Sequence, residues 1–185
     1  MHALIRTLSG GLALVLCLAT AGASAQSQQP RRPVTPVSPF VGTWNINVAK
    51  STYEGIPENQ RRTISTRTID VEGDGVFVQT HRNTSAVRAQ SFSHWVGKPD
   101  GPPITEYSRL NGIEPGNRLT IKTVNDHQWQ VTFRNQRGEV SLTDTWTVSA
   151  DGKTLTIDRR GTSQDGTPNH SVEVYDNESY SMPVR

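Results

Sequence analysis

Cysteine is almost absent from this 185-residue chain, since Cys17 is the single example. Cys17 lies within the first 25 residues, which carry the features of a cleavable leader. We therefore predict a mature chain without disulfides and without thiol chemistry. Such a chain must be stable through packing alone, and it offers no cysteine nucleophile.

Long apolar runs and charge of one sign are also lacking. The apolar run from Leu12 to Ala19 is shorter than the ~20 residues that a membrane-spanning helix needs. Lysine and arginine number 19 against 17 acidic residues, and removal of Arg6 with the leader leaves the mature chain close to neutral. The charges are dispersed, which argues against nucleic acid as a partner.

Motifs for catalysis and metal binding are missing as well. The sequence has no Gly-x-Ser-x-Gly elbow and no His-Glu-x-x-His helix motif. The segment from Asp70 to Gly75 resembles the start of a calcium loop, but the twelfth position, which needs a carboxylate, is His81. We therefore predict a glycine-containing hairpin turn there, and neither a catalytic residue, a metal site nor a cofactor.

The first 25 residues predict a secretory signal peptide. Arg6 supplies the positive start, the apolar run follows, and Ala23-Ser24-Ala25 fits a small-x-small cleavage site. The expected location is the periplasm or the extracellular space, with no transmembrane segment after cleavage. The oligomeric state does not follow from the sequence.

Residues 26–39 change in character, because they hold several prolines and almost nothing to bury. Such a segment predicts a disordered linker. The folded domain is expected over residues 40–178, followed by a tail at residues 179–185.

Apolar side chains in the domain recur at every second position, which is typical of strands with one buried face. The clearest runs are Trp44–Val48, Trp129–Phe133, Val140–Val148, Leu155–Ile157 and Val172–Val174. Short turn segments separate them, while 51–59 and 111–117 are expected to be loops because they contain glycine and proline. No window holds a helical period. This pattern predicts an all-β fold, an antiparallel up-and-down barrel of about 8–10 strands.

Gly42-Thr43-Trp44, at the start of the first strand, resembles the Gly-x-Trp signature of lipocalins and the wider calycin superfamily. The run from Phe40 to Ser51 and the later segment Asp151–Ile157 look like parts of bacterial secreted lipocalin-like proteins. The resemblance implies a lipocalin-like barrel with a ligand cup. It also implies that Trp44 closes the bottom of the barrel beneath a basic residue, either Arg159 or Arg160.

Asp144 is the most informative polar residue, since it shares the phase of Leu142 and Trp146 on the expected inner face. A buried carboxylate needs a partner or a wet cavity, although a bulge could instead turn it outward. Aromatic residues on nearby strands could line the same cup. The candidate ligand-binding residues are His94, Trp95, Tyr107, Trp129, Phe133, Asp144 and Trp146.

Three functions fit these patterns. The leading hypothesis is a barrel that binds a small, mostly apolar or amphipathic ligand without catalysis. A second is a calycin-like enzyme, an isomerase or cyclase, that uses a cavity aspartate or histidine as acid or base. A third is a structural or interaction barrel of the cell envelope with a filled interior.

Overall fold

The computed structural model describes residues 38–109, 114–162 and 166–178. The predicted signal peptide, most of the predicted linker and the predicted tail lie outside these ranges. The strands are β1 (Gly42–Ile46), β2 (Thr52–Glu54), β3 (Arg62–Glu72), β4 (Val76–Ser85), β5 (Gln90–Gly97), β6 (Ile104–Arg109), β7 (Glu114–Asn125), β8 (Gln128–Arg134), β9 (Val140–Val148), β10 (Thr154–Thr162) and β11 (Pro168–Asn177).

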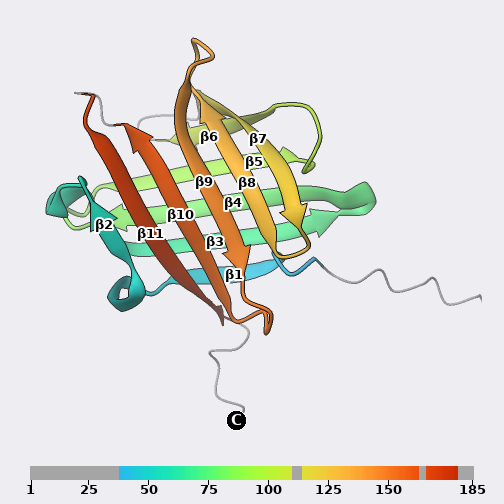
Figure 1. The fold of residues 1–185 in the computed structure, drawn as a ribbon, viewed down its shortest axis with the longest axis horizontal. Helices are drawn as coiled ribbons and strands as arrows, with labels where there is room; N and C mark the ends of the chain where they lie inside the picture. Colours follow the sequence, from blue (N-terminus) through green and yellow to red (C-terminus); the bar gives the residue numbers. More distant parts are fainter. Residues whose placement is uncertain (1–37, 110–113, 163–165, 179–185) are drawn as a thin grey trace, which may run out of the picture. The chain divides into compact units, whose positions relative to one another are not determined.

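Ten of these strands form a closed antiparallel barrel, which confirms the predicted fold class. From β3 to β11 each strand pairs with the next in the chain, and β1 pairs with both β3 and β11. The later strands, coloured orange to red, cross in front of the earlier blue and green ones (Figure 1). Closure in this order requires only short connections between neighbouring strands.

The edge of β11 that faces away from β10 is shared by β1 and β2. Trp44 to Ile46 pair with Asn177 to Tyr175, and Thr52 to Glu54 pair with Val172 to His170. The short 3-10 helix η1 (Val48–Lys50) connects these two pairings. β2 therefore adds an eleventh strand beside the seam of the barrel (Figure 1).

Two loop predictions were wrong. The expected loop at 51–59 contains β2, whose three residues are too few to show a period-2 pattern. The expected turn at 111–117 contains the start of β7, where Pro115 and Gly116 lie within the strand. A register shift between Thr105 and Tyr107 on β6 accommodates the irregular start of β7 in the sheet.

The expected turn at residues 70–75 is present as the 3-10 helix η3 (Gly73–Gly75), where Asp74 and Gly75 both have positive φ. A further 3-10 helix, η2 (Glu58–Gln60), precedes β3. Within the described ranges, no helix is long and apolar enough to cross a membrane.

The core consists of side chains from alternate positions on every barrel strand. Trp44, Trp95 and Trp146 are fully buried. The Phe40 ring stacks on Trp129 with 3.7 Å between centroids, and the edge of Phe77 packs against the same indole. Together these rings give one part of the interior an apolar filling.

Candidate ligand site inside the barrel

Another part of the interior is polar. The described residues include eight buried polar or charged side chains, which are Ser65, Arg67, Gln79, His81, Asp144, Ser171, Glu173 and Asn177. They come from β3, β4, β9 and β11 and point to the same side of the sheet as the core residues. Burial of such groups is costly unless they have partners, so their partners define the site.

Asp144 and Arg159 form the first buried ion pair. The Arg159 guanidinium donates from Nε at 2.9 Å and from Nη2 at 2.6 Å to the two carboxylate oxygens. Trp146 Nε1 donates to the same carboxylate at 3.1 Å. Asp144 therefore faces inward and is structurally paired, which is one of the alternatives that its phase left open.

Arg62 and Glu173 form the second buried ion pair, and it begins a chain of hydrogen bonds. The Tyr175 hydroxyl donates to Glu173 at 2.9 Å and lies 3.1 Å from Ser65 Oγ. Ser65 Oγ in turn lies 2.8 Å from His81 Nε2. The chain links β3, β4 and β11 across the interior.

Arg67 lies between two aromatic faces and forms no ion pair with a carboxylate of the described residues. Its guanidinium carbon is 5.0 Å from the centroid of the Trp146 ring and 5.4 Å from that of Tyr175. Its Nη1 donates to Gln79 Oε1 at 3.3 Å, a long hydrogen bond to a neutral group. Its Nε is buried without a hydrogen-bond partner.

The arginines set the protonation of their neighbours. Burial would raise the pKa of Glu173, but the charges of Arg62, Arg159 and Arg67 lower it to about 2. Burial and the same three arginines hold the pKa of His81 well below its usual value. At neutral pH the glutamate is therefore ionised and the histidine is neutral.

β2 contributes a tyrosine hydroxyl to this polar interior. Tyr53 pairs with Ser171, whose Oγ is buried without a hydrogen-bond partner among the described residues. Burial, followed by the charge of Glu173, raises the pKa of Tyr53 to about 12. The hydroxyl therefore remains a neutral hydrogen-bonding group close to the buried charges.

Five of the seven predicted ligand-binding residues lie in the barrel interior. Trp95, Trp129, Phe133, Asp144 and Trp146 are all buried. Trp146 borders the polar cluster directly, through Asp144 and Arg67. The arrangement places an apolar surface beside a charged one inside the barrel.

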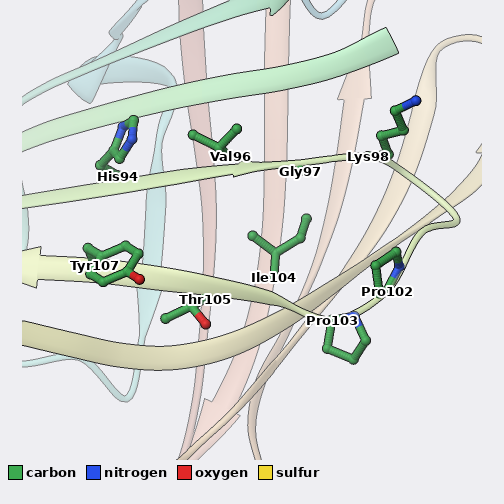
Figure 2. A pocket seen from close by; sticks show the side chains of 9 residues that line it. All are labelled: His94, Val96, Gly97, Lys98, Pro102, Pro103, Ile104, Thr105 and Tyr107. Atoms are coloured by element: carbon green, nitrogen blue, oxygen red, sulfur yellow. The ribbon is translucent and has the colours of Figure 1, made fainter. Parts of the chain in front are cut away.

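His94 and Tyr107 lie elsewhere, at a depression of about 470 Å³ beside β5 and β6. The pairing of these strands ends at His94 and Tyr107, and the two strands separate beyond that point. Figure 2 shows the lining residues on both strands and the two prolines of the connecting loop. Tyr107 is 43% exposed. These two residues therefore do not join the interior cluster.

Among the described residues, neither Arg159 nor Arg160 is found over the ring of Trp44. Arg159 is held by Asp144, whereas the side chain of Arg160 is 70% exposed and faces Asp158. Among the described residues, the arginines over aromatic rings are Arg61 and Arg67. Trp44 is nonetheless fully buried, and its Nε1 donates to the Phe40 carbonyl at 3.0 Å.

Gly42 packs where β1 meets β11. A Cβ atom at this position would lie 3.2 Å from Nδ2 of Asn177. The φ of Gly42 is +149°, a value that side chains rarely adopt. The start of β1 therefore depends on glycine for its close approach to the last strand.

The charged members of the site were missed from the sequence. Arg62, Arg67 and Glu173 look like surface residues in a period-2 pattern, because charged side chains usually face water. On β11 the apolar Val172 and Val174 suggested the buried face, yet Glu173 and Tyr175 are the residues that point inward. The in-phase sequence Ser65, Arg67, Ile69 is the signal that could have revealed Arg67.

No group of three or more histidine, cysteine or acidic side chains suited to a metal ion occurs within the described ranges. The polar cluster instead offers guanidinium, hydroxyl and carboxylate groups. Such groups bind and orient a small molecule through hydrogen bonds and charge.

No protein-family model matches the chain, and no curated protein matches it in sequence. Solved structures with a similar closed barrel are found. The fold is similar to that of the fluorescent protein UnaG. Wild-type UnaG superposes with a TM-score of 0.50 at 15% identity, covering 75% of this chain and 96% of UnaG. An asparagine-to-glutamine mutant of UnaG gives a TM-score of 0.50 at 14% identity, covering 76% and 96%.

At this level of identity the likeness to UnaG establishes the fold alone. The barrel is a closed antiparallel barrel, as the resemblance of the Gly-Thr-Trp segment implied. A bacterial origin stays a prediction. The residues that surround the interior of this chain have to be interpreted from their own chemistry.

Proposed function

We propose that the protein binds one small, mostly apolar ligand inside the barrel, without catalysis. The observation that carries the proposal is that Ser171 Oγ and Arg67 Nε are buried in the interior without a hydrogen-bond partner among the described residues. Buried polar groups in a filled structural barrel would be paired within the protein. The comparison with UnaG supports a barrel of this type.

The chemistry of the interior favours binding over acid–base catalysis. Both oxygens of Asp144 accept hydrogen bonds from Arg159 or Trp146, so this carboxylate is already committed to partners within the protein. His81 is the inward histidine of the cluster, and burial together with the neighbouring arginines lowers its pKa and disfavours the protonated form that an acid catalyst needs.

The leader sequence supports a periplasmic or secreted location for this binding activity. The apolar run followed by Ala23-Ser24-Ala25 fits signal-peptide cleavage. Fractionation of cells that express the full chain, with mass determination of the product, tests this part. An intact N-terminus on a cytoplasmic product would contradict it.

Binding itself is tested by titrating the purified protein with uncharged and charged apolar probes while tryptophan fluorescence is recorded. All four tryptophans are buried in the core, so a ligand in the interior should change their emission saturably, at one molecule per chain. A probe bound on the outer surface should leave the emission of these buried tryptophans unchanged. A barrel with a filled interior, the third hypothesis, would bind none of the probes.

A further inference from the structure

Three arginines meet on the outer surface of the barrel, beside the turn that joins β8 to β9. Arg118 on β7 and Arg134 on β8 are directly paired across the sheet. Their neighbours Leu119 and Phe133 are buried in the core, so the two arginines point outward, and both are exposed. Arg137, in the turn, is the third. All three line a depression of about 320 Å³.

The turn after β8 is held by the side chain of Asn135. Its Oδ1 accepts hydrogen bonds from the backbone N–H groups of Arg137 at 2.9 Å and Glu139 at 3.1 Å. Gly138, at a φ of +84°, donates its N–H to the Asn135 carbonyl at 2.9 Å. Nη1 of Arg134 donates to the Gly138 carbonyl at 3.0 Å. The guanidinium group of Arg134 is therefore fixed beside the turn that carries Arg137.

Acidic side chains do not balance these three positive charges. Among the described residues, none of the three arginines forms an ion pair. The carboxylate of Glu139 instead accepts a hydrogen bond from Asn135 at 2.8 Å, and that of Glu106 accepts one from Asn117 at 3.3 Å. Like charges directly opposite each other destabilise a sheet. Negative charge supplied from outside the protein would remove this repulsion between β7 and β8.

We propose that this depression binds a doubly charged phosphate group, either as free phosphate or as the monoester group of a small molecule. Guanidinium groups pair with phosphate oxygens through parallel N–H donors. A phosphate monoester offers three acceptor oxygens and close to two negative charges near neutral pH, which matches three converging arginines. Thr120 and Gln136 also line the depression and add uncharged hydrogen-bonding groups. The site lies outside the barrel, so it goes beyond the ligand proposed for the interior.

The experiment follows the backbone amide signals of the isotope-labelled full-length protein by NMR during titration at about pH 7.5, where a phosphate monoester is doubly charged. The probes are inorganic phosphate, methyl phosphate, dimethyl phosphate and acetate. Constant ionic strength keeps the screening of exposed charges equal in all titrations. We expect the two doubly charged probes to shift the signals of residues 118–120 and 134–138 saturably. They should bind at least about fivefold more tightly than the two singly charged probes.

Arg118→Gln and Arg137→Gln are the decisive variants, because each removes one positive charge from the depression. Each should weaken the binding of inorganic phosphate about fivefold, and the double variant should lose saturable binding. Lys122→Gln is the matched control. Lys122 is an exposed cation on the same face of β7, and it does not line the depression. It should bind phosphate like the wild type. Surface substitutions of this kind change stability little, so all variants should fold.

Equal weakening of phosphate binding by Lys122→Gln and Arg118→Gln would reveal a general charge effect and overturn the site. Equal affinities for phosphate and acetate, or the absence of saturable shifts at residues 134–138, would also overturn it. Equal binding of inorganic and methyl phosphate supports recognition of the phosphate group from either source, whereas binding of inorganic phosphate alone assigns the site to the free ion. These outcomes are independent of the interior ligand, which is tested by tryptophan emission with apolar probes.

Discussion

Glu173 keeps its negative charge inside the barrel because it is surrounded by positive charge. Glu173 is only 2% exposed, and burial alone would favour the neutral form of its carboxyl group. Arg62 pairs with it directly, Arg159 and Arg67 act from further away, and Tyr175 donates a hydrogen bond. The result is a pKa of about 2 against an ordinary value of 4.5.

This lowered pKa predicts an acid-sensitive contribution to stability. Because the folded state holds the proton less tightly, the contribution is complete above about pH 4.5 and is lost as the pH falls towards 2. Glu173→Gln should flatten the pH dependence in that range. It should also lower the free energy of unfolding at pH 7 by about 3 kcal/mol, because Arg62 is left unpaired.

Urea unfolding of both proteins between pH 2 and 7 measures the effect. Asp176→Asn is the control on the same strand, since Asp176 pairs with Lys50 in a largely exposed position. An exposed pair contributes at most about 1 kcal/mol. Parallel curves for the wild type and Glu173→Gln would show that the buried pair does not set the acid response.

His81 predicts a second pH effect, at milder acidity. Burial and the charges of Arg67, Arg62 and Arg159 lower its pKa, so protons bind the unfolded chain more readily than the folded one. The contribution of neutral His81 to the free energy of unfolding is therefore fully present above about pH 6.5, the pKa in the unfolded chain. It decreases as the pH falls below that value. His81→Gln should remove this loss. Thermal unfolding temperatures of both proteins between pH 7.5 and 5 provide the measurement, and an unchanged slope would contradict it.

At the residue scale, the sequence placed Asp144 in phase with the expected inner face and left an outward position through a bulge open, and it did not reveal the partner. Arg159 and Arg160 are adjacent, and only the strand phase decides which one reaches Asp144. Inward charges on β3 and β11 oppose the rule that charged side chains face water. These charges are accommodated because side chains distant in the sequence pair with them, as Arg62 pairs with Glu173. A local sequence pattern does not reveal such partners.

At the scale of the element, β2 is held against β11 by few contacts. Its three residues pair with β11, and His170 lies 3.4 Å from Glu54 and 3.0 Å from Asp158. Gly55 ends the strand at a φ of +65°, and a Cβ there would lie 2.6 Å from the Pro168 carbonyl oxygen. The backbone conformation and the close approach both require glycine.

Gly55→Ala should therefore loosen β2, at a cost of about 1–2 kcal/mol from the left-handed backbone alone. Hydrogen exchange of peptides that cover β2 and residues 170–172 should become faster, while exchange of β8 and β9 stays unchanged. Gly73→Ala is the control, because nothing lies within 4 Å of the added atom. Equal exchange in the two variants would contradict the prediction.

The long strands were predictable as elements because apolar residues alternate within them, as in Trp129–Phe133 and Val140–Val148. β2 and the start of β7 were not, since one is very short and the other begins with Pro115 and Gly116. β2 is held by its pairing with β11, and the start of β7 is held by its pairing with β6. The sequences of β11 and β6 predict strands by themselves. Tertiary pairing thus overrides the local preference at these two sites.

At the scale of the whole barrel, closure depends on the packing of Trp44. Its indole is fully buried on the first strand, and its neighbours in the sheet are Arg67 on β3 and Asn177 on β11. Trp44→Ala should cost about 3–5 kcal/mol and abolish the cooperative thermal transition. Val124→Ala, at an exposed position, serves as the control. An unchanged melting curve for Trp44→Ala would show that closure does not need this side chain.

The closed antiparallel barrel itself was predicted from the order of short alternating strands and turns. Up-and-down order follows from short connections, since each hairpin places the next strand beside the last. The identity of the buried charges, and with them the chemistry of the site, required the register between β1, β3 and β11.

The seam between β1 and β11 has a consequence for how the chain reaches its folded state. β11 is the last described strand to be synthesised, yet it completes the pairing of the first strand and also holds β2. Until it arrives, β1 and β10 each present an open edge to other chains. Contacts so distant in sequence slow folding. The growing polypeptide is therefore most exposed to aggregation immediately before β11 appears.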